Sequence, residues 1–161
     1  MLKNYEINGV IKTAPALAVG SGSKYTFLFA GAFAVKANGI VSIAATPADA
    51  PALTTAVAAD GTTPTTLAID YCRVYTLLAS VSATGALAYS LVVGADFPET
   101  RAMKMSDVNW GNGFNADEKK AVVGFIYIVN TTNVFTPGAT ALDASGVTTR
   151  YFDNAPALLG M

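Results

Sequence analysis

Histidine is absent from this chain of 161 residues, and cysteine occurs once, at Cys72. Without histidine, no Ser-His-Asp or Cys-His catalytic arrangement and no histidine-ligated zinc or iron site can form. A lone cysteine cannot form an intrachain disulfide. We expect Cys72 to be a small buried hydrophobic residue in a strand, with a thiol activated by the neighbouring Arg73 as the alternative.

Charged residues are also scarce. They make up 13% of the sequence, against about 25% in an ordinary globular protein. So few charges predict that other subunits cover a good part of the surface, the alternative being a neutral monomer whose exposed faces are Ala, Gly, Ser and Thr. The net charge of −1 argues against a nucleic-acid partner, because phosphate binding requires a local excess of Lys and Arg.

Motifs for catalysis and cofactor binding are missing as well. The sequence contains no phosphate-binding P-loop, no GxGxxG and no CxxC. Its acidic residues are scattered, and the nearest pairs are Asp96 with Glu99 and Asp117 with Glu118. We interpret both pairs as solvated surface rather than as the two carboxylates of a glycosidase. The sequence therefore predicts no enzyme activity, no cofactor and no metal ion.

Residues 74–95 lack charge for long enough to cross a bilayer. A polar turn at residues 80–85 divides this run, and the two halves are rich in the aromatic and β-branched residues of strands. The pattern therefore predicts a hairpin and no membrane partner. Residues 1–6 have no apolar segment behind their positive charge, so we expect no secretory signal and synthesis in a cytoplasm.

The most strongly patterned stretch is residues 121–151. Apolar β-branched and aromatic residues fill positions 122–129 on both pleat faces, which predicts a central strand covered on both sides. Pro137 and Gly138 then force a corner, since proline fixes its own backbone and glycine permits a positive φ. Residues 147–152 follow a second turn and predict a returning strand.

The rest of the chain contains further strand and helix signals. Residues 25–35 predict a strand, and Asn38-Gly39 is a strong hairpin signal that leads into a second strand at residues 40–43. A longer hairpin is expected from residues 65–81 and 86–93. Two short helical segments are expected from capping patterns, one turn at residues 46–49 and a helix near residues 115–120.

These elements predict an all-β fold, a single-domain β-sandwich or barrel-like structure. Residues 1–24 form the predicted N-terminal arm, and residues 25–161 form the β domain with a charged insertion loop at 96–120. The arm's apolar residues are candidates for pairing with the sheet edge of a neighbouring subunit, and a loosely tethered terminus is the alternative. These candidates are Tyr5, Ile7 and Val10.

Trp110 and Phe114 flank a Gly-Asn-Gly loop and complete the candidate interface. An aromatic side chain on such a loop can anchor a protein interface or stack on a sugar ring. It can also fold back with its ring on the core. The sequence leaves these three interpretations open.

The strings VVGFIYIVN and VFTPGATALDASGVTTRYFDN resemble the C-terminal module of tailed-phage virion proteins, among them auxiliary head proteins and capsid decoration or cement proteins. The similarity covers residues 122–154, with Ala139 where threonine is commoner in that module and Arg150 in the last strand. It implies a structural virion protein on the outer surface of a bacteriophage capsid, which braces the head through contacts with the major capsid protein and with itself, for example as a trimer.

Two other functions stay open beside this one. The first alternative is a carbohydrate- or receptor-binding module of a head or tail fibre that uses the Trp110 loop. The second is a polysaccharide-cleaving domain with two catalytic carboxylates, which we rank last because no acidic pair is evident in the sequence.

Overall fold

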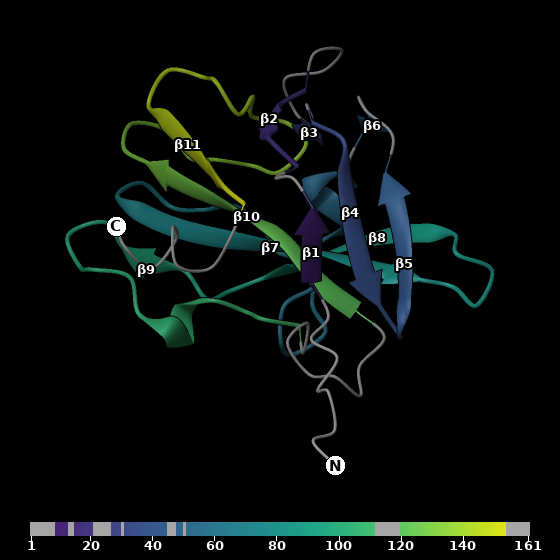
Figure 1. Ribbon diagram of the computed structural model, residues 1–161. Helices are drawn as coiled ribbons and strands as arrows, with labels where there is room; N and C mark the ends of the chain where they lie inside the picture. The colour runs from purple at the N-terminus through teal and green to yellow at the C-terminus, as the bar shows by residue number, and fades with distance from the viewer. Residues whose placement is uncertain are drawn as a thin grey trace.

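The computed structural model describes residues 9–12, 15–20, 27–29, 31–44, 48–49, 51–111 and 120–153. Within these residues the regular structure consists of antiparallel strands and two 3-10 turns, η1 (Leu53–Thr55) and η2 (Met105–Asp107). The prediction of an all-β fold is confirmed. Figure 1 shows a long central sheet with two smaller sheets against it.

The central sheet has the strand order β11-β10-β7-β8, and a short strand, β9, pairs with the start of β7. Its strands are β7 (Tyr71–Val81), β8 (Leu87–Val93), β9 (Phe97–Pro98), β10 (Lys120–Asn130) and β11 (Val147–Phe152). The predicted central strand, its returning partner and the β7–β8 hairpin are all confirmed. The first strand of that hairpin begins at Tyr71 rather than at residue 65, because Asp70 has a φ of 63°, which an extended strand cannot continue.

Two three-stranded sheets complete the fold, in the orders β1-β4-β5 and β2-β3-β6. Their strands are β1 (Gly9–Lys12), β2 (Leu17–Val19), β3 (Phe27–Phe29), β4 (Phe33–Ala37), β5 (Ile40–Ala44) and β6 (Ala48–Asp49). Asn38 and Gly39, with φ of 54° and 70°, join β4 to β5 as predicted. The single strand expected over residues 25–35 is instead two strands in different sheets.

Both described segments of the predicted arm pair with strands of the same chain. β1 pairs with β4, where Val10 lies opposite Val35, and β2 pairs with β3. Leu17 of β2 is buried in the core, at 8% exposure. Tyr5 and Ile7, the other arm residues predicted to form an interface, lie outside the described residues. Where the structure describes residues 1–24, they are part of the β fold.

The helical predictions have different outcomes. The helical turn predicted at residues 46–49 is wrong for its last two residues, because Ala48 and Asp49 form the strand β6, which pairs with β3. Most of the helix expected near residues 115–120 lies outside the described residues, and Lys120 is already the first residue of β10. The helical turns seen in the described part of the chain are η1 and η2.

A β-bulge in β10 determines which of its side chains point to each face of the central sheet. Val122 pairs with Leu78 and Gly124 pairs with Leu77, so Val123 is an extra residue. Before the bulge the odd-numbered side chains of β10 point to one face of the sheet, and after it the even-numbered side chains point to that face. Gly124 has no space for a side chain, because a Cβ there would lie 2.7 Å from the carbonyl oxygen of Phe152.

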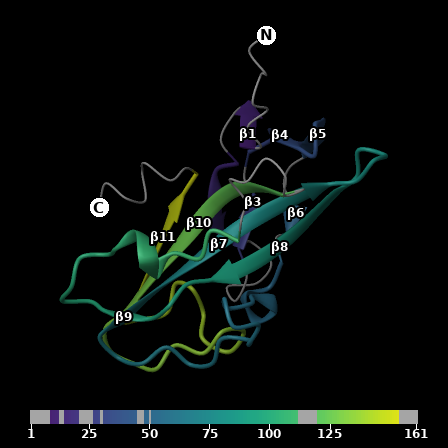
Figure 2. The ribbon, with the colours of Figure 1, turned by 90° about the horizontal axis from the view of Figure 1, so that it is seen from below.

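The central sheet is covered on both faces, as its apolar strands predicted. On one face lies the first core, between the central sheet and the two small sheets, where the rings of Phe33 and Tyr89 are 6.5 Å apart. On the other face lies the second core, beneath residues 94–111, which we call the covering segment (Figure 2). The second core contains Cys72, Val74, Phe97, Val108, Phe125, Tyr127 and Val129.

Candidate functional site

Two glycines allow close packing of the covering segment, Gly94 within the segment and Gly111 against the central sheet. At Gly94 there is no room for a Cβ beside the carbonyl oxygen of Asp107, and a Cβ on Gly111 would meet the Leu78 side chain at 2.4 Å. The predicted insertion loop therefore packs on the sheet through its buried residues, among them Phe97 and Val108. Trp110 lies near its end, edge-on to the ring of Phe125, with 5.5 Å between ring centroids and an interplanar angle of 80°.

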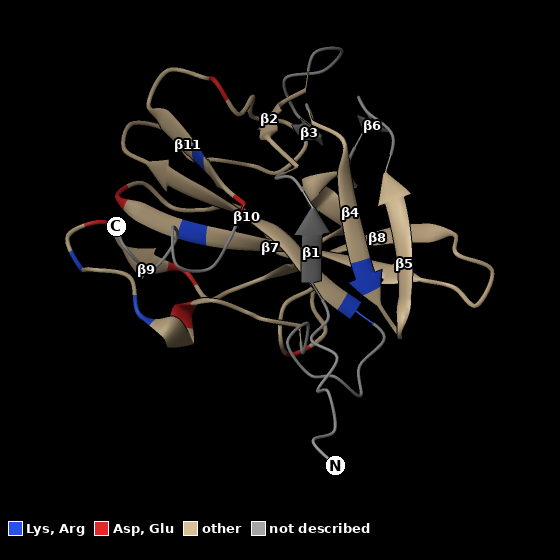
Figure 3. Ribbon diagram, viewed as in Figure 1, with Lys and Arg blue, Asp and Glu red and all other residues tan. Residues whose placement is uncertain are grey.

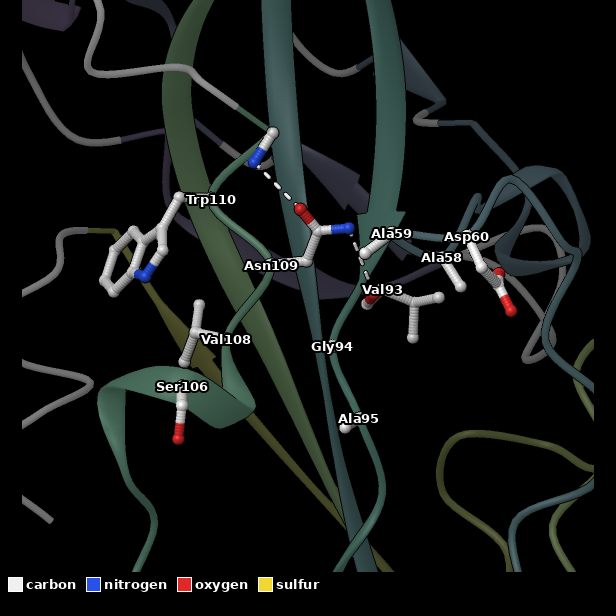
Figure 4. A pocket seen from close by; sticks show the side chains of 11 residues that line it. Ala58, Ala59, Asp60, Val93, Gly94, Ala95, Ser106, Val108, Asn109 and Trp110 are labelled. Atoms are coloured by element: carbon white, nitrogen blue, oxygen red, sulfur yellow. Dashed lines mark hydrogen bonds between the residues drawn. The ribbon is translucent and has the colours of Figure 1, made fainter.

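A pocket of about 610 Å³ opens between the covering segment, the end of β8 and the turn at residues 58–60 (Figure 4). Trp110, Val108 and Ser106 line it from the covering segment, and Val93 lines it from the end of β8. The walls are mainly small or apolar, which suits a ring-shaped or apolar group rather than a charged one.

Three polar side chains of the pocket, those of Asn109, Trp110 and Asp60, already make hydrogen bonds within the chain. Asn109 donates from Nδ2 to the carbonyl oxygen of Val93 at 3.2 Å and accepts from the Gly111 N–H at 3.0 Å. The Trp110 Nε1–H donates to the Met105 carbonyl oxygen at 3.4 Å. Asp60 accepts hydrogen bonds from Thr62, which hold the pKa of its carboxyl below the usual value. A ligand that used the amide of Asn109 or the indole N–H of Trp110 would have to break some of these bonds.

One member of the predicted acidic pair, Asp96, is bound to an arginine. Arg73, which is 4% exposed, donates from Nε to Asp96 Oδ1 at 2.6 Å and from Nη2 to Oδ2 at 2.8 Å. The same guanidinium donates to the Thr65 carbonyl oxygen at 2.8 Å. Asp96 is solvent-exposed, as predicted, and is also the ion-pair partner of Arg73. Asp117 and Glu118 lie outside the described residues.

A second ion pair lies within the covering segment. Arg101 donates from Nη1 and Nη2 to the two carboxylate oxygens of Asp107, at 2.7 and 2.8 Å, and its guanidinium lies 4.8 Å from the centroid of the Phe97 ring. The hydrogen bond from Arg101 is the main reason that the pKa of Asp107 is lowered. In the described part of the chain, no group of three or more Cys, Asp or Glu side chains could hold a metal ion.

Cys72 is fully buried in the second core, as predicted. The Tyr127 hydroxyl donates to its sulfur at 3.1 Å. Burial is the main cause of a raised pKa for this thiol, so at neutral pH it is protonated. The alternative of a thiol activated by Arg73 is not supported, because Arg73 is bound to Asp96.

Large apolar side chains are exposed at several positions that the sequence reasoning missed, among them Val57 and Met105. Val41 and Ile43, at 51% and 75% exposure, form what we call the β5 patch. Ile69, Tyr71 and Val134, at 44%, 38% and 49%, form what we call the Tyr71 patch. Four of the five residues of β5 are apolar, so the sequence does not show which face of this strand is turned towards the core.

Of the five predicted interface residues, the structure describes the side chain of Trp110, which is partly buried against the second core. Phe114, like Tyr5 and Ile7, lies outside the described residues. No helix in the described ranges is long and apolar enough to span a membrane. Comparisons with protein families, with curated sequences and with solved structures give no match. The functional argument therefore depends on the geometry of the chain and on the resemblance of residues 122–154.

Proposed function

We propose that this chain is a structural virion protein of a tailed phage, a decoration or cement subunit that binds the outside of the capsid. The β5 patch is the observation that supports this proposal. Ile43 is 75% exposed although it lies in a regular strand. Burying a side chain of this kind is worth about 1.5–3 kcal/mol, so contact with another protein would stabilise this surface.

The proposed mechanism is mechanical and involves no chemical step. The central sheet is packed on both faces, which gives a scaffold that keeps its shape under load. Each contact with the major capsid protein or with another copy would be modest. Symmetry repeats the contact around the particle, and avidity makes the summed attachment strong. The subunit needs no cofactor for this role.

Retention by expanded capsids tests the proposal. Purified protein is mixed with capsids that lack it, and the bound fraction is measured after sedimentation. We expect Ile43→Lys to weaken retention at least tenfold, since one buried apolar side chain is worth more than the ~1.4 kcal/mol of a tenfold change. Met105→Lys is the matched control, because Met105 is 62% exposed but lies in η2. Absence of wild-type retention, or equal retention of both variants, would reject the proposal.

The pocket beside Trp110 favours one alternative, a carbohydrate-binding module of a head or tail fibre. A glycan array compares the wild type with Trp110→Ala and with Ala59→Phe. Ala59 is an exposed pocket residue, so Ala59→Phe fills the pocket without disturbing the second core. A glycan signal that both variants abolish would support the alternative, and a blank array would exclude it for the glycans displayed.

A further inference from the structure

We infer that residues 100–111, which we call the strap, open away from the central sheet while the sheet itself stays folded. The strap is the part of the covering segment that follows β9, and it lies across the second core (Figure 2). Its opening uncovers an apolar face that the closed chain hides. This inference goes beyond the proposed function and does not depend on it.

The strap is held in shape by hydrogen bonds among its own residues. The Arg101 guanidinium is bonded to both carboxylate oxygens of Asp107, and one of these oxygens also accepts from the Lys104 N–H at 2.6 Å. The Trp110 Nε1–H donates to the Met105 carbonyl oxygen at 3.4 Å. Because each bond joins two residues of the strap, none of them has to break when the strap moves as a whole.

Apolar side chains hold the strap on the central sheet. Met103, Val108 and Trp110 pack against the second core. Asn109 adds a hydrogen bond to the carbonyl oxygen of Val93. By contrast, β7 and β10 pair by main-chain hydrogen bonds along nearly their whole lengths. Opening the strap therefore costs less free energy than separating these strands.

Two hollows beside the strap reduce its packing. The first is the pocket of about 610 Å³ that Val108 and Trp110 line. A second hollow, of about 280 Å³, lies between residues 99–103 and the side chains of Tyr127 and Val129 in β10. A side chain that faces a hollow lacks the dispersion contacts of close packing. The strap is therefore held less firmly than the strands beneath it.

Both ends of the strap are suited to act as pivots. Just before the strap, the Glu99 N–H donates to the Asp70 carbonyl oxygen at 2.8 Å. Asp96, earlier in the covering segment, is bonded to Arg73. These bonds keep β9 on the sheet when the strap moves. At the other end Gly111 has a φ of 53°, and glycine changes its backbone conformation more freely than other residues because it has no Cβ.

The outer side of the strap is polar. Charged residues of both signs lie along the covering segment (Figure 3). Within the strap, Lys104 and Ser106 are exposed, and the Arg101 side chain is 32% exposed. This side is hydrated whether the strap is closed or open, so its hydration does not oppose the motion.

Opening the strap gives access to Cys72. The Cys72 side chain is fully buried in the second core, and its sulfur accepts the hydrogen bond from Tyr127. Residues 99–103 face Tyr127 across the smaller hollow. With the strap closed, the sulfur is shielded from reagents in solution. Since Cys72 is the one cysteine of the chain, its reaction with a thiol reagent measures how often the strap opens.

Labelling of Cys72 by N-ethylmaleimide tests the inference, at reagent concentrations where the rate is proportional to the reagent. The rate in native buffer divided by the rate for the denatured chain gives the accessible fraction, and urea unfolding gives the globally unfolded fraction. We expect the accessible fraction to exceed the unfolded fraction at least tenfold and to rise weakly with urea, since opening exposes little surface. If the two fractions are equal, the sulfur is reached by global unfolding and the inference is wrong.

Two matched valine variants show which element moves. Val108→Ala removes a buried contact of the strap, and Val35→Ala removes one from β4 in the first core. Both should lower the resistance to urea. We expect Val108→Ala to speed the labelling of Cys72 several-fold in the absence of urea and Val35→Ala to leave it unchanged. Equal acceleration by the two variants would overturn the inference. So would the absence of any acceleration in Val108→Ala, because the sulfur would then be reached with the strap in place.

Discussion

The two faces of the central sheet are covered in different ways. The first core is enclosed by strands of two further sheets and by the long loops that contain Leu53, Leu67 and Phe135. The second core is smaller and lies beneath the covering segment, whose regular structure consists of β9 and η2. Strands that are hydrogen-bonded to one another resist movement, whereas an irregular segment can shift. The first face therefore defines the fold, and the second face depends on local anchors.

Those anchors are polar. The Arg73–Asp96 pair ties the start of the covering segment to β7 and to the Thr65 carbonyl oxygen. The Arg101–Asp107 pair holds the middle of the segment together. In a charge-poor chain, four of the charged residues are thus used to fix one segment. This comparison teaches that the few charges serve structure as well as solubility. Four measurements test the difference between the two faces.

The largest expected difference is between two buried phenylalanines. Phe33 of β4 is in the first core and Phe97 of β9 is in the second, and both are at most 1% exposed. We expect Phe33→Ala to lower the free energy of unfolding by about 5 kcal/mol and Phe97→Ala by about 3 kcal/mol. The loss is smaller for Phe97→Ala because the covering segment can shift and partly fill the cavity that the missing ring leaves. Urea unfolding at 25 °C measures both. Equal losses would show that the second face is as rigid as the first.

The second comparison concerns the two members of one ion pair. Asp96→Ala leaves the buried Arg73 without its carboxylate, and since the Asp96 side chain is 34% exposed we expect the lower end of the usual cost, about 3 kcal/mol. Arg73→Met leaves a carboxylate that water can reach, so we expect a loss of about 1–2 kcal/mol. The same unfolding assay applies. A larger loss for Arg73→Met would mean that packing around the arginine outweighs its charge.

The smallest effects are expected at two buried phenols, one on each face. The Tyr127 hydroxyl donates to the sulfur of Cys72 on the second face, so Tyr127→Phe should lower the free energy of unfolding by about 0.5–1 kcal/mol. The Tyr151 hydroxyl is buried without a hydrogen-bond partner and packs against the first core. Tyr151→Phe should therefore be neutral or stabilising by up to about 1 kcal/mol. Thermal unfolding of the two variants, compared side by side, should shift in opposite directions.

Tyr151 also predicts a dependence on alkaline pH. Burial raises its pKa to about 12, from an ordinary value of 10.0 for tyrosine. The unfolded chain therefore loses this proton first, and the stability that the neutral phenol contributes is present below about pH 10 and declines as the pH rises towards 12. Tyr151→Phe should reduce this decline. An unchanged pH profile in the variant would show that other groups cause it.

Much of the strand content was predictable from local pattern. Asn38-Gly39, the apolar positions 122–129 and the turn after Pro137 each combine backbone preference with side-chain type, and the structure bears out all three. The two-piece strand at residues 25–35 was not predictable, because the sequence is apolar throughout and a change of sheet depends on which partners are near. For the same reason the sequence did not predict that β1 pairs with β4 and that β2 pairs with β3 in the same chain.

The sites were less predictable than the strands. Trp110 was identified, and the structure places it between a pocket and the second core. The β5 and Tyr71 patches were missed, since exposure is a property of what the rest of the chain leaves uncovered. The ion pair between Arg73 and Asp96 joins positions 23 residues apart, and no local signal connects them.

The sequence by itself determined that this protein is built from strands and that histidine chemistry is excluded, because residue type and short-range spacing control backbone preference and the available functional groups. The tertiary structure decided which face of each strand is buried, which charges are paired and which apolar side chains are left exposed. These depend on contacts between distant segments, and a single bulge at Val123 is enough to reverse which side chains meet which core.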